Sequence, residues 1–393
     1  MKHVDEFRDP ALGQAALARI AALVPQAQRA LGRKSVAEGG APIKIMEVCG
    51  GHTHTIFRYG IEGMLPDDLE LVHGPGCPVC VLPIGRVDAA IELARRPGVV
   101  FCTFGDAMRV PGSDASLLQA KAQGADVRTV YSPADALTLA RELPGREVIF
   151  FGLGFETTAP STALVVTEAA LTGVTNFSVF SNHITIIPTL QALLDSPGLS
   201  IDGFVGPGHV TMVIGMPPYD LVAQRYGKPM VIAGFEPLDL LQSVAMVLEQ
   251  LVAGVARVEN QYARVVREGG NARAQAAIDD VFELRESFEW RGLGEVPSSG
   301  LRLRERYAAF DAERRYGLVA RRVADPKACQ CGEVLKGALQ PWECKVFGTA
   351  CTPETPIGSC MVSSEGACAA YYNYGRLSTV RRIPRTPAKE PAA

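Results

Sequence analysis

Long apolar runs and an excess of either charge are both missing from this sequence. Its 393 residues hold 39 Lys and Arg against 42 Asp and Glu, which gives a formal net charge of −3. This balance gives no reason to expect a nucleic-acid partner or an anionic membrane surface. The sequence contains no run of about 18 apolar residues, the length needed to span a bilayer. The opening residues, MKHVDEFRDP, lack the apolar stretch of a signal peptide. We therefore expect a cytoplasmic protein without a membrane or nucleic-acid partner.

Cysteine is absent between Cys102 and Cys329, although the whole sequence contains ten. In a reducing compartment this number indicates metal binding or redox chemistry rather than a disulfide framework. One group lies in the first third of the chain and a second in its last 65 residues. The groups are Cys49, Cys77, Cys80 and Cys102, then Cys329, Cys331, Cys344, Cys351, Cys360 and Cys368. Two separate thiol sites on different domains are therefore predicted.

Short apolar segments alternate with amphipathic ones after residue 40, which is typical of a parallel sheet with crossover helices. This alternation of apolar and amphipathic segments occurs in two successive series along the chain. It predicts an α/β fold of two similar parallel-sheet units, residues 40–132 and 133–255, that face a central cleft. An Ala-rich helical segment, residues 1–39, precedes them, and we expect its helix to be interrupted near Pro25.

The pattern changes after residue 255, where a C-terminal domain of helices and loops is predicted over residues 256–380. The charged stretch 257–270 is expected to be helical and the stretch 290–300 to be a loop. The cysteine-rich part has little periodicity, as expected where ligation rather than a core organises the chain. The tail, residues 381–393, is expected to be disordered.

Histidine gathers where the predicted strands end. In open parallel sheets, ligands bind beyond the carboxyl ends of the strands. Five of the six histidines follow such ends, namely His52, His54, His73, His183 and His209. Glycine is common in loops generally, but this does not explain why the histidines gather at one edge, or rim, of the predicted sheets. We interpret this rim as a functional cleft, with His54, Glu156, Thr157 and His209 as candidate lining residues.

The segment HGPGCPVC, residues 73–80, places Cys77 and Cys80 in a loop rich in glycine and proline. Gly74 and Gly76 let the backbone approach a ligand, and a helix that follows would stabilise a nearby thiolate. A redox-active dithiol is the favoured interpretation. Half of a zinc site is the alternative, although a second nearby pair is missing.

Cys49 ends the first predicted strand and is followed by two glycines, then His52 and His54. One accessible thiolate with nearby imidazole suits a mononuclear transition-metal site with open positions. A nucleophilic Cys–His pair is the other interpretation, and the sequence does not separate the two. Cys102, within an apolar strand, is predicted to be a buried core thiol.

Two further patterns concern cofactors. The segment GLGFET lacks the third glycine of a dinucleotide-binding loop because Thr157 stands there, so NAD binding is rejected. Near the C-terminus, four thiolates could hold zinc or a [4Fe–4S] cluster. The long, unequal spacing C-x12-C-x6-C-x16-C, from Cys331 to Cys368, favours iron–sulfur over a zinc ribbon.

The sequence resembles the HypD family of hydrogenase maturation proteins from about residue 3 to residue 375. The resemblance is carried by EVCGGHTHT, HGPGCPVCVLP, FCTFGDAMRVPG, GLGFETTAP, GPGHV, GFEPLDLL, VENQYARVV and MVSSEGACAAYY. It implies a role in assembling the Fe(CN)2CO unit of [NiFe]-hydrogenase. The implied partners are a HypC-type chaperone and HypE, which donates cyanide with HypF upstream of it. A monomer in transient complexes is expected.

The resemblance also implies residue roles. Cys49 would hold the iron together with a cysteine of the chaperone, His52 matches the family's histidine after the two glycines, and Cys77 and Cys80 would be the redox-active pair. Glu365, in the EGAC stretch, would face the site. The cluster ligands map to Cys331, Cys344, Cys351 and Cys368, which leaves Cys329 and Cys360 as extra thiols.

We therefore expect a scaffold with redox capability rather than a turnover enzyme. A general thiol–disulfide oxidoreductase of the ferredoxin–thioredoxin reductase type is the main alternative. A purely structural zinc protein is a third hypothesis.

Overall fold

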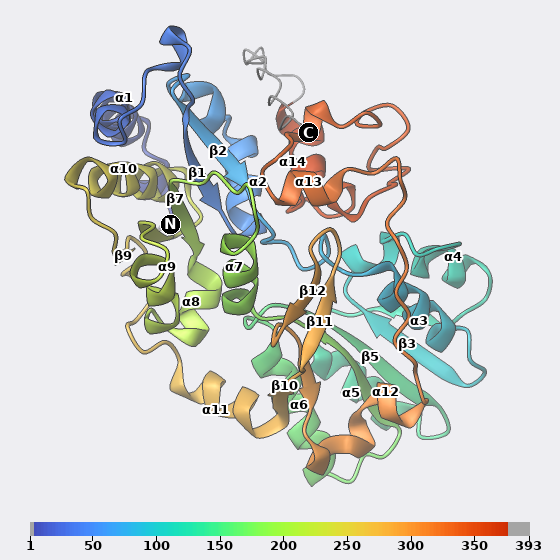
Figure 1. Cartoon of the computed structure of the whole chain (residues 1–393). Helices are drawn as coiled ribbons and strands as arrows, with labels where there is room; N and C mark the ends of the chain where they lie inside the picture. Colours follow the sequence, from blue (N-terminus) through green and yellow to red (C-terminus); the bar gives the residue numbers. More distant parts are fainter. Residues whose placement is uncertain (1–3, 376–393) are drawn as a thin grey trace.

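Two parallel β-sheets with helices around them make up most of the fold in the computed structural model, which describes residues 4–375 (Figure 1). The first sheet has the strand order β2-β1-β7-β8-β9 and the second the order β4-β3-β5-β6. The first sheet comprises β1 (Ile43–Glu47), β2 (Leu69–His73), β7 (Gly203–Pro207), β8 (Met230–Ala233) and β9 (Val258–Asn260). The second comprises β3 (Val99–Thr103), β4 (Val127–Thr129), β5 (Glu147–Gly154) and β6 (Phe177–His183). The predicted α/β class with two parallel sheets is confirmed.

The two sheets are interleaved along the chain, and this differs from the predicted succession of units. After β2 the chain leaves the first sheet, builds the second from β3 to β6, and returns at β7. β7 then pairs with β1, with Ile45 opposite Gly203. A boundary near residue 132 therefore does not separate the sheets. Strands and helices alternate in the same way before and after the chain passes from one sheet to the other. The alternation therefore carries no information about which sheet a strand joins.

Helices α1 (Pro10–Ala30) and α10 (Pro237–Ala253) lie side by side on one face of the first sheet. Apolar side chains from both helices and from β1 and β8 share one buried core there, with Ile20 and Val231 fully buried. The expected interruption at Pro25 is wrong, because α1 runs continuously through it. Val24 and Ala27 on either side are buried in this core, and their packing offsets the hydrogen bond that proline cannot make.

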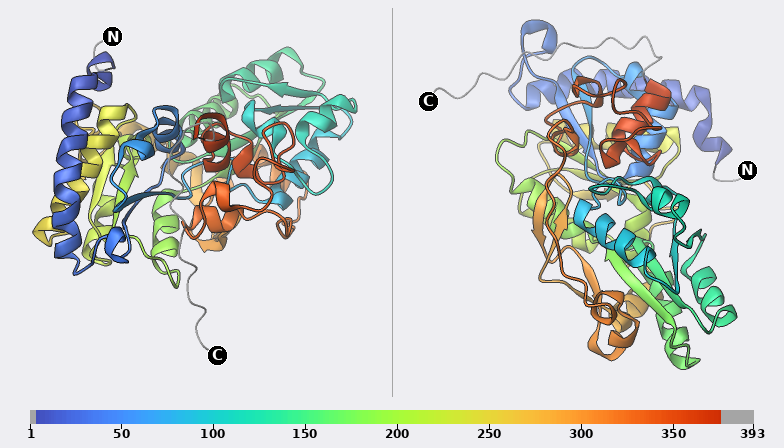
Figure 2. Two further views of the ribbon diagram at one scale, coloured as in Figure 1. Left: turned by 90° about the horizontal axis from the view of Figure 1, so that it is seen from above. Right: turned by 90° about the vertical axis from the view of Figure 1, so that its right-hand side faces the viewer.

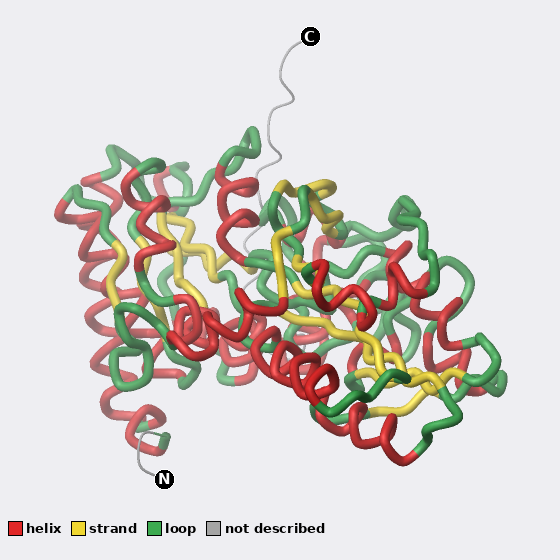
Figure 3. The backbone as a smooth tube through the Cα atoms, turned by 90° about the horizontal axis from the view of Figure 1, so that it is seen from below, coloured by secondary structure: helices red, strands yellow, loops and turns green. Residues whose placement is uncertain are grey.

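Shorter helices complete the two sheets. Around the first sheet these are α2 (Gly50–Arg58), α7 (Ile186–Leu194), α8 (Gly208–Ile214) and α9 (Asp220–Gln224). Around the second they are α3 (Ile84–Ala94), α4 (Leu117–Ala122), α5 (Pro133–Glu142) and α6 (Ala159–Leu171). Figure 3 shows the strands gathered in two groups, one in each half of the molecule. A single buried core joins them, since it contains Phe204 of β7, Phe101 and Phe151 of the second sheet, and Cys360.

The C-terminal part begins with α11 (Ala272–Val281) and two antiparallel strand pairs. These pairs are β10 (Phe282–Leu284) with β13 (Leu301–Leu303), and β11 (Ser287–Trp290) with β12 (Gly294–Pro297). Two expectations were wrong here: residues 257–270 form β9 and turns rather than a helix, and residues 290–300 belong to a hairpin rather than a loop. In both places short strands complete a neighbouring sheet or core, which local charge and glycine content do not reveal.

The cysteine-rich segment follows α12 (Ala312–Arg315) and contains α13 (Cys331–Leu335) and α14 (Ala367–Ala370). Drawn in red in Figure 2, it lies beside the blue part of the first sheet and the cyan part of the second. The predicted disordered tail, residues 381–393, lies outside the described residues. Of the helices in residues 4–375, none combines the length and apolar character needed to cross a membrane.

Candidate functional site

Cys49 lies between the end of β1 and the first turn of α2, where it is partly exposed. The loop that follows β2 lies directly against it, with the amide of Gly50 donating to the carbonyl of Gly76 at 3.2 Å. A Cβ atom on Gly76 would overlap the backbone N and Cα of Cys49. This close approach requires glycine, and it brings the loop carrying Cys77 and Cys80 next to the Cys49 thiol.

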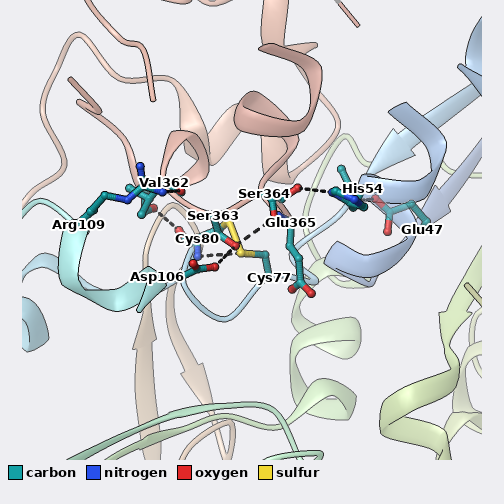
Figure 4. The surroundings of a disulfide bond; sticks show 12 residues. Glu47, His54, Cys77, Cys80, Asp106, Arg109, Val362, Ser363, Ser364 and Glu365 are labelled. Carbon is teal, nitrogen blue, oxygen red and sulfur yellow. Dashed lines mark hydrogen bonds between the residues drawn. A yellow bond between two sulfur atoms is a disulfide. The ribbon is translucent and has the colours of Figure 1, made fainter. Parts of the chain in front are cut away.

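Cys77 and Cys80 form a disulfide with their Cα atoms 5.3 Å apart, and both are buried (Figure 4). The cover comes from the cysteine-rich segment. A Cβ atom on Gly366 would lie 2.9 Å from the Cys80 sulfur, and the Ser359 hydroxyl donates to the Cys80 carbonyl. The disulfide is therefore enclosed by a part of the chain 279 residues away in sequence.

Glu47 is a buried carboxylate that organises the surroundings of Cys49. It accepts hydrogen bonds from the Cys49 amide at 2.9 Å, from the Thr53 hydroxyl, and from His73 Nδ1 at 2.8 Å. Burial alone would lower the pKa of His73, but hydrogen bonds with Glu47 and Glu62 raise it to about 9. His73 is therefore protonated at neutral pH, and its positive charge compensates the buried carboxylate.

Burial and the neighbouring carboxylates of Glu365 and Glu47 raise the pKa of the Cys49 thiol. The backbone amides of Gly51 and His52, at the start of α2, act in the opposite direction. Without a cation, Cys49 is held as a neutral thiol. A metal cation would favour the thiolate instead, because its charge dominates the local field.

A row of rings lies behind Cys49. His52 stacks on Phe235 with centroids 4.8 Å apart, and His209 stacks on the same ring at 3.7 Å. Burial lowers the pKa of His52, and burial together with His52 lowers the pKa of His209 to about 4. Both imidazoles are neutral. His52 Nε2 lies 3.4 Å from the Ala233 carbonyl, while its Nδ1 is buried without a partner among the described residues.

The remaining predicted lining residues divide between the site and its surroundings. His54 Nδ1 lies 3.2 Å from the Ser364 carbonyl (Figure 4). The Glu365 carboxylate lies over Gly50, next to Cys49 in the chain. Glu156 is buried deeper, and burial raises its pKa to about 7. Thr157 is exposed before α6.

His183 does not join the group around Cys49. It is buried within the second sheet, where Ser181 and Thr162 lie within hydrogen-bond distance of its ring nitrogens. Burial and the charge of Arg285 lower its pKa to about 3. Cys102 is fully buried on β3, as predicted, and burial raises its pKa to about 12.

Several C-terminal thiols lie together. The thiol of Cys331 hydrogen-bonds those of Cys329 and Cys368, and these contacts raise the pKa of both partners. Cys360 is close enough to raise the pKa of Cys368 through its charge. Cys331 and Cys329 raise the pKa of Cys351 in the same way. Thus Cys329 and Cys360, which the spacing leaves over, lie among the proposed ligands.

Cys344 is the proposed ligand with the least direct connection to this group. It lies on a loop joined to it through the Lys345 amide, which donates to the Gln330 side chain at 3.1 Å. Within residues 4–375, no group of three or more His, Cys, Asp or Glu side chains is arranged as a metal-binding set. The donors nevertheless suit an iron–sulfur cluster chemically, because soft thiols gather there in excess of four.

Sequence reasoning missed several residues of the site. Glu47 alternates with apolar neighbours like a surface strand residue, and Phe235 looks like an ordinary apolar residue after β8. Asp106 and Arg109, in the loop after β3, contact the cysteine-rich segment near the disulfide. The signal that could have found all four is their place at strand ends, the same rule that predicts Glu156 and Thr157 as lining residues.

Comparison with known proteins identifies the family. A family model named HypD, described as the hydrogenase formation hypA family, matches residues 25–375. Hydrogenase maturation factor HypD from Rhodobacter capsulatus is 60% identical over 379 residues, covering 95% of this chain and 98% of the relative. The proteins of that name from Azotobacter vinelandii and Escherichia coli are 55% and 53% identical, over 96% and 95% of this chain and 97% and 98% of their own. The chain therefore belongs to the HypD family.

Proposed function

We propose that this protein serves hydrogenase maturation as a scaffold on which the Fe(CN)2CO unit is assembled. The observation that carries the proposal is that three cysteine-bearing segments meet: Gly76 lies against Cys49, and Gly366 lies against Cys80. One partly exposed thiol, one enclosed disulfide and the cysteine-rich segment from Cys329 to Cys368, which we call the cysteine-rich lobe, thus adjoin each other. The names of the relatives supply the process in which such a site would act.

In this proposal the iron is the cargo. Cys49 binds it as a thiolate together with a cysteine of a HypC-type chaperone, and HypE delivers cyanide. Low-spin iron with cyanide and carbonyl ligands prefers soft, electron-rich donors. The partial exposure of Cys49 leaves room for a second protein to reach the metal. Glu365 lies over Gly50 beside this thiol, and the His52 amide donates to the Cys49 carbonyl at 2.8 Å.

The disulfide supplies redox capability. Reduction of the Cys77–Cys80 bond takes up two electrons and two protons and gives two thiols. Cys331, Cys344, Cys351 and Cys368 would hold a [4Fe–4S] cluster, which supplies electrons one at a time when bound. The Gly366 contact puts the lobe that contains these cysteines directly against the Cys80 sulfur.

Infrared spectroscopy of the protein purified with its chaperone partner tests this function. We expect cyanide and carbonyl stretching bands in the wild-type complex and their loss in Cys49→Ala. Cys102→Ala is a matched control, because it removes a buried thiol on β3 outside the site. Absence of the bands from the wild-type complex would contradict the scaffold role.

A general thiol–disulfide oxidoreductase remains the alternative. It predicts that Cys77→Ser abolishes reduction of an unrelated disulfide substrate, whereas Cys49→Ala does not. The near-complete burial of Cys77 and Cys80 disfavours it, because a large substrate cannot reach either sulfur without displacement of the lobe.

A further inference from the structure

The loop after β3 holds the cysteine-rich lobe through polar contacts that the assembly function alone does not explain. The Asp106 carboxylate accepts a hydrogen bond from the Ser363 hydroxyl at 2.8 Å. Arg109 donates to the Val362 carbonyl at 2.8 Å and to the Pro353 carbonyl at 3.4 Å. Figure 4 shows these side chains reaching from one side toward the segment that covers the disulfide. We call Asp106, Arg109 and Ser363 the polar clamp.

The polar clamp joins parts of the chain that no continuous element connects. Asp106 and Arg109 follow β3 of the second sheet, whereas the disulfide loop follows β2 of the first sheet. Residues 359–366 contact both loops, through Ser359 on Cys80 and through Ser363 on Asp106. The cover over the disulfide is therefore anchored at two points on different sheets.

The polar clamp is distinct from the apolar packing beneath it. Cys360, Met361 and Val362 are buried in the same core as Cys80. Asp106 and Arg109, by contrast, are exposed residues whose polar ends hydrogen-bond the segment at Ser363 and Val362, which are themselves buried. Loss of their contacts would release the rim of the cover without removing any core side chain, so the protein should stay folded.

We infer that Asp106 and Arg109 are positioning residues that keep the cysteine-rich lobe closed over the Cys77–Cys80 disulfide and so exclude small thiols from it. Unselective reduction by bulk thiols would bypass any electron delivery within the protein. This inference deepens the proposed function of the disulfide and rests on it for its biological meaning. Its test, however, uses the disulfide alone.

The test measures reduction of the disulfide in the purified full-length protein by dithiothreitol under anaerobic conditions. In this step the Cys77–Cys80 bond breaks, two thiols form, and the dithiol reagent becomes a cyclic disulfide, with two electrons and two protons transferred. The newly formed thiols are trapped with an alkylating reagent and assigned by peptide mass spectrometry. Only modification of Cys77 and Cys80 is counted.

We expect reduction to be about tenfold faster in Asp106→Ala, in Ser363→Ala and in Arg109→Ala, because each loses at least one anchoring hydrogen bond. The Asp106→Ala/Ser363→Ala double variant should be no faster than Ser363→Ala alone, since Ser363→Ala already removes the hydrogen bond that Asp106→Ala removes, together with the bond that the Glu365 amide donates to the Ser363 hydroxyl. Asp106→Asn, which keeps an oxygen acceptor for Ser363, should stay close to wild type. Circular dichroism should be unchanged in all of them.

Arg141→Ala is the matched control, because it removes an exposed arginine that pairs with Glu168 far from the disulfide. Wild-type rates in both Asp106→Ala and Ser363→Ala would overturn the proposal, as would equal acceleration in Arg141→Ala. Loss of the infrared bands tests the scaffold role separately. A clamp that fails its test leaves those bands in place, and a failed scaffold role leaves the reduction rates as predicted.

Discussion

At the scale of single residues, the surroundings of Cys49 depend on a buried acid rather than on cysteine or histidine alone. Glu47 is 1% exposed and accepts hydrogen bonds from the Cys49 amide, from Thr53 of α2 and from His73 of β2. A carboxylate so deeply buried is stable only when it is fully hydrogen-bonded and its charge is compensated. His73 provides that compensation and is itself held by Glu62 on its other nitrogen.

This pair predicts a pH dependence of stability. The pKa of His73 is raised to about 9 in the folded protein, above the value of about 6.5 expected when unfolded. Its contribution is therefore fully present below about pH 6.5 and is lost as the pH rises through 9. Compared with His73→Gln, the wild type should be more stable by about 3 kcal/mol at pH 6 and by much less at pH 10.

Denaturant unfolding of both proteins across this pH range measures the difference. The comparison cancels titrating groups that do not contact His73, such as Glu156, which are present in both proteins. A difference in unfolding free energy that stays constant with pH would show that His73 is not charged in the folded state.

At the scale of elements, glycine determines how closely the strand-end loops approach each other. The Gly76 position lies against the Cys49 backbone, and the Gly366 position lies between the Cys80 sulfur and the Cys360 carbonyl. Neither has room for a side chain. Two of these loops follow β1 and β2, and the third belongs to the cysteine-rich segment. The three cysteine-bearing segments can therefore meet only because residues 76 and 366 have no Cβ atom.

Two glycine-to-alanine substitutions should act in opposite directions. Gly76→Ala should destabilise the protein by about 1–3 kcal/mol, because its Cβ would meet backbone atoms that cannot easily move. Gly13→Ala, in α1 with no atom within 4 Å of the added Cβ, should stabilise it by about 0.5–1 kcal/mol. Equilibrium denaturation gives both values. Destabilisation by Gly13→Ala, or tolerance of Gly76→Ala, would contradict the packing described.

At the scale of the whole molecule, the two sheets and the cysteine-rich lobe share one core and should unfold together. The two tryptophans report on different parts of this core region. Trp290 packs on Phe155 near the second sheet, and Trp342 packs on Tyr371 in the lobe.

Tryptophan fluorescence tests this cooperativity. In Trp342→Phe only Trp290 reports, and in Trp290→Phe only Trp342 reports. We expect each variant to show one unfolding transition by fluorescence that coincides with its transition by circular dichroism. An earlier, separate transition of Trp342 would show that the lobe unfolds by itself.

The sequence was sufficient to predict the fold class and the meeting of several site residues. Parallel strands place their carboxyl ends on one edge of a sheet, so the sequence pattern alone assigns Cys49, His52, Cys77 and His209 to one region. His183 obeys the same rule on the other sheet and so lies elsewhere. Which strands share a sheet is decided by long-range pairing, such as Ile45 opposite Gly203, and local periodicity does not encode it.

The strand order has a consequence for how the protein is made. Strands β3 to β6 are contiguous, so the second sheet can close as soon as they leave the ribosome. β1 and β2 are translated first but must wait for β7, which lies between β1 and β8. The lobe over Cys80 comes last of all. Newborn chains therefore cover the Cys77–Cys80 pair only after every strand of both sheets has been translated.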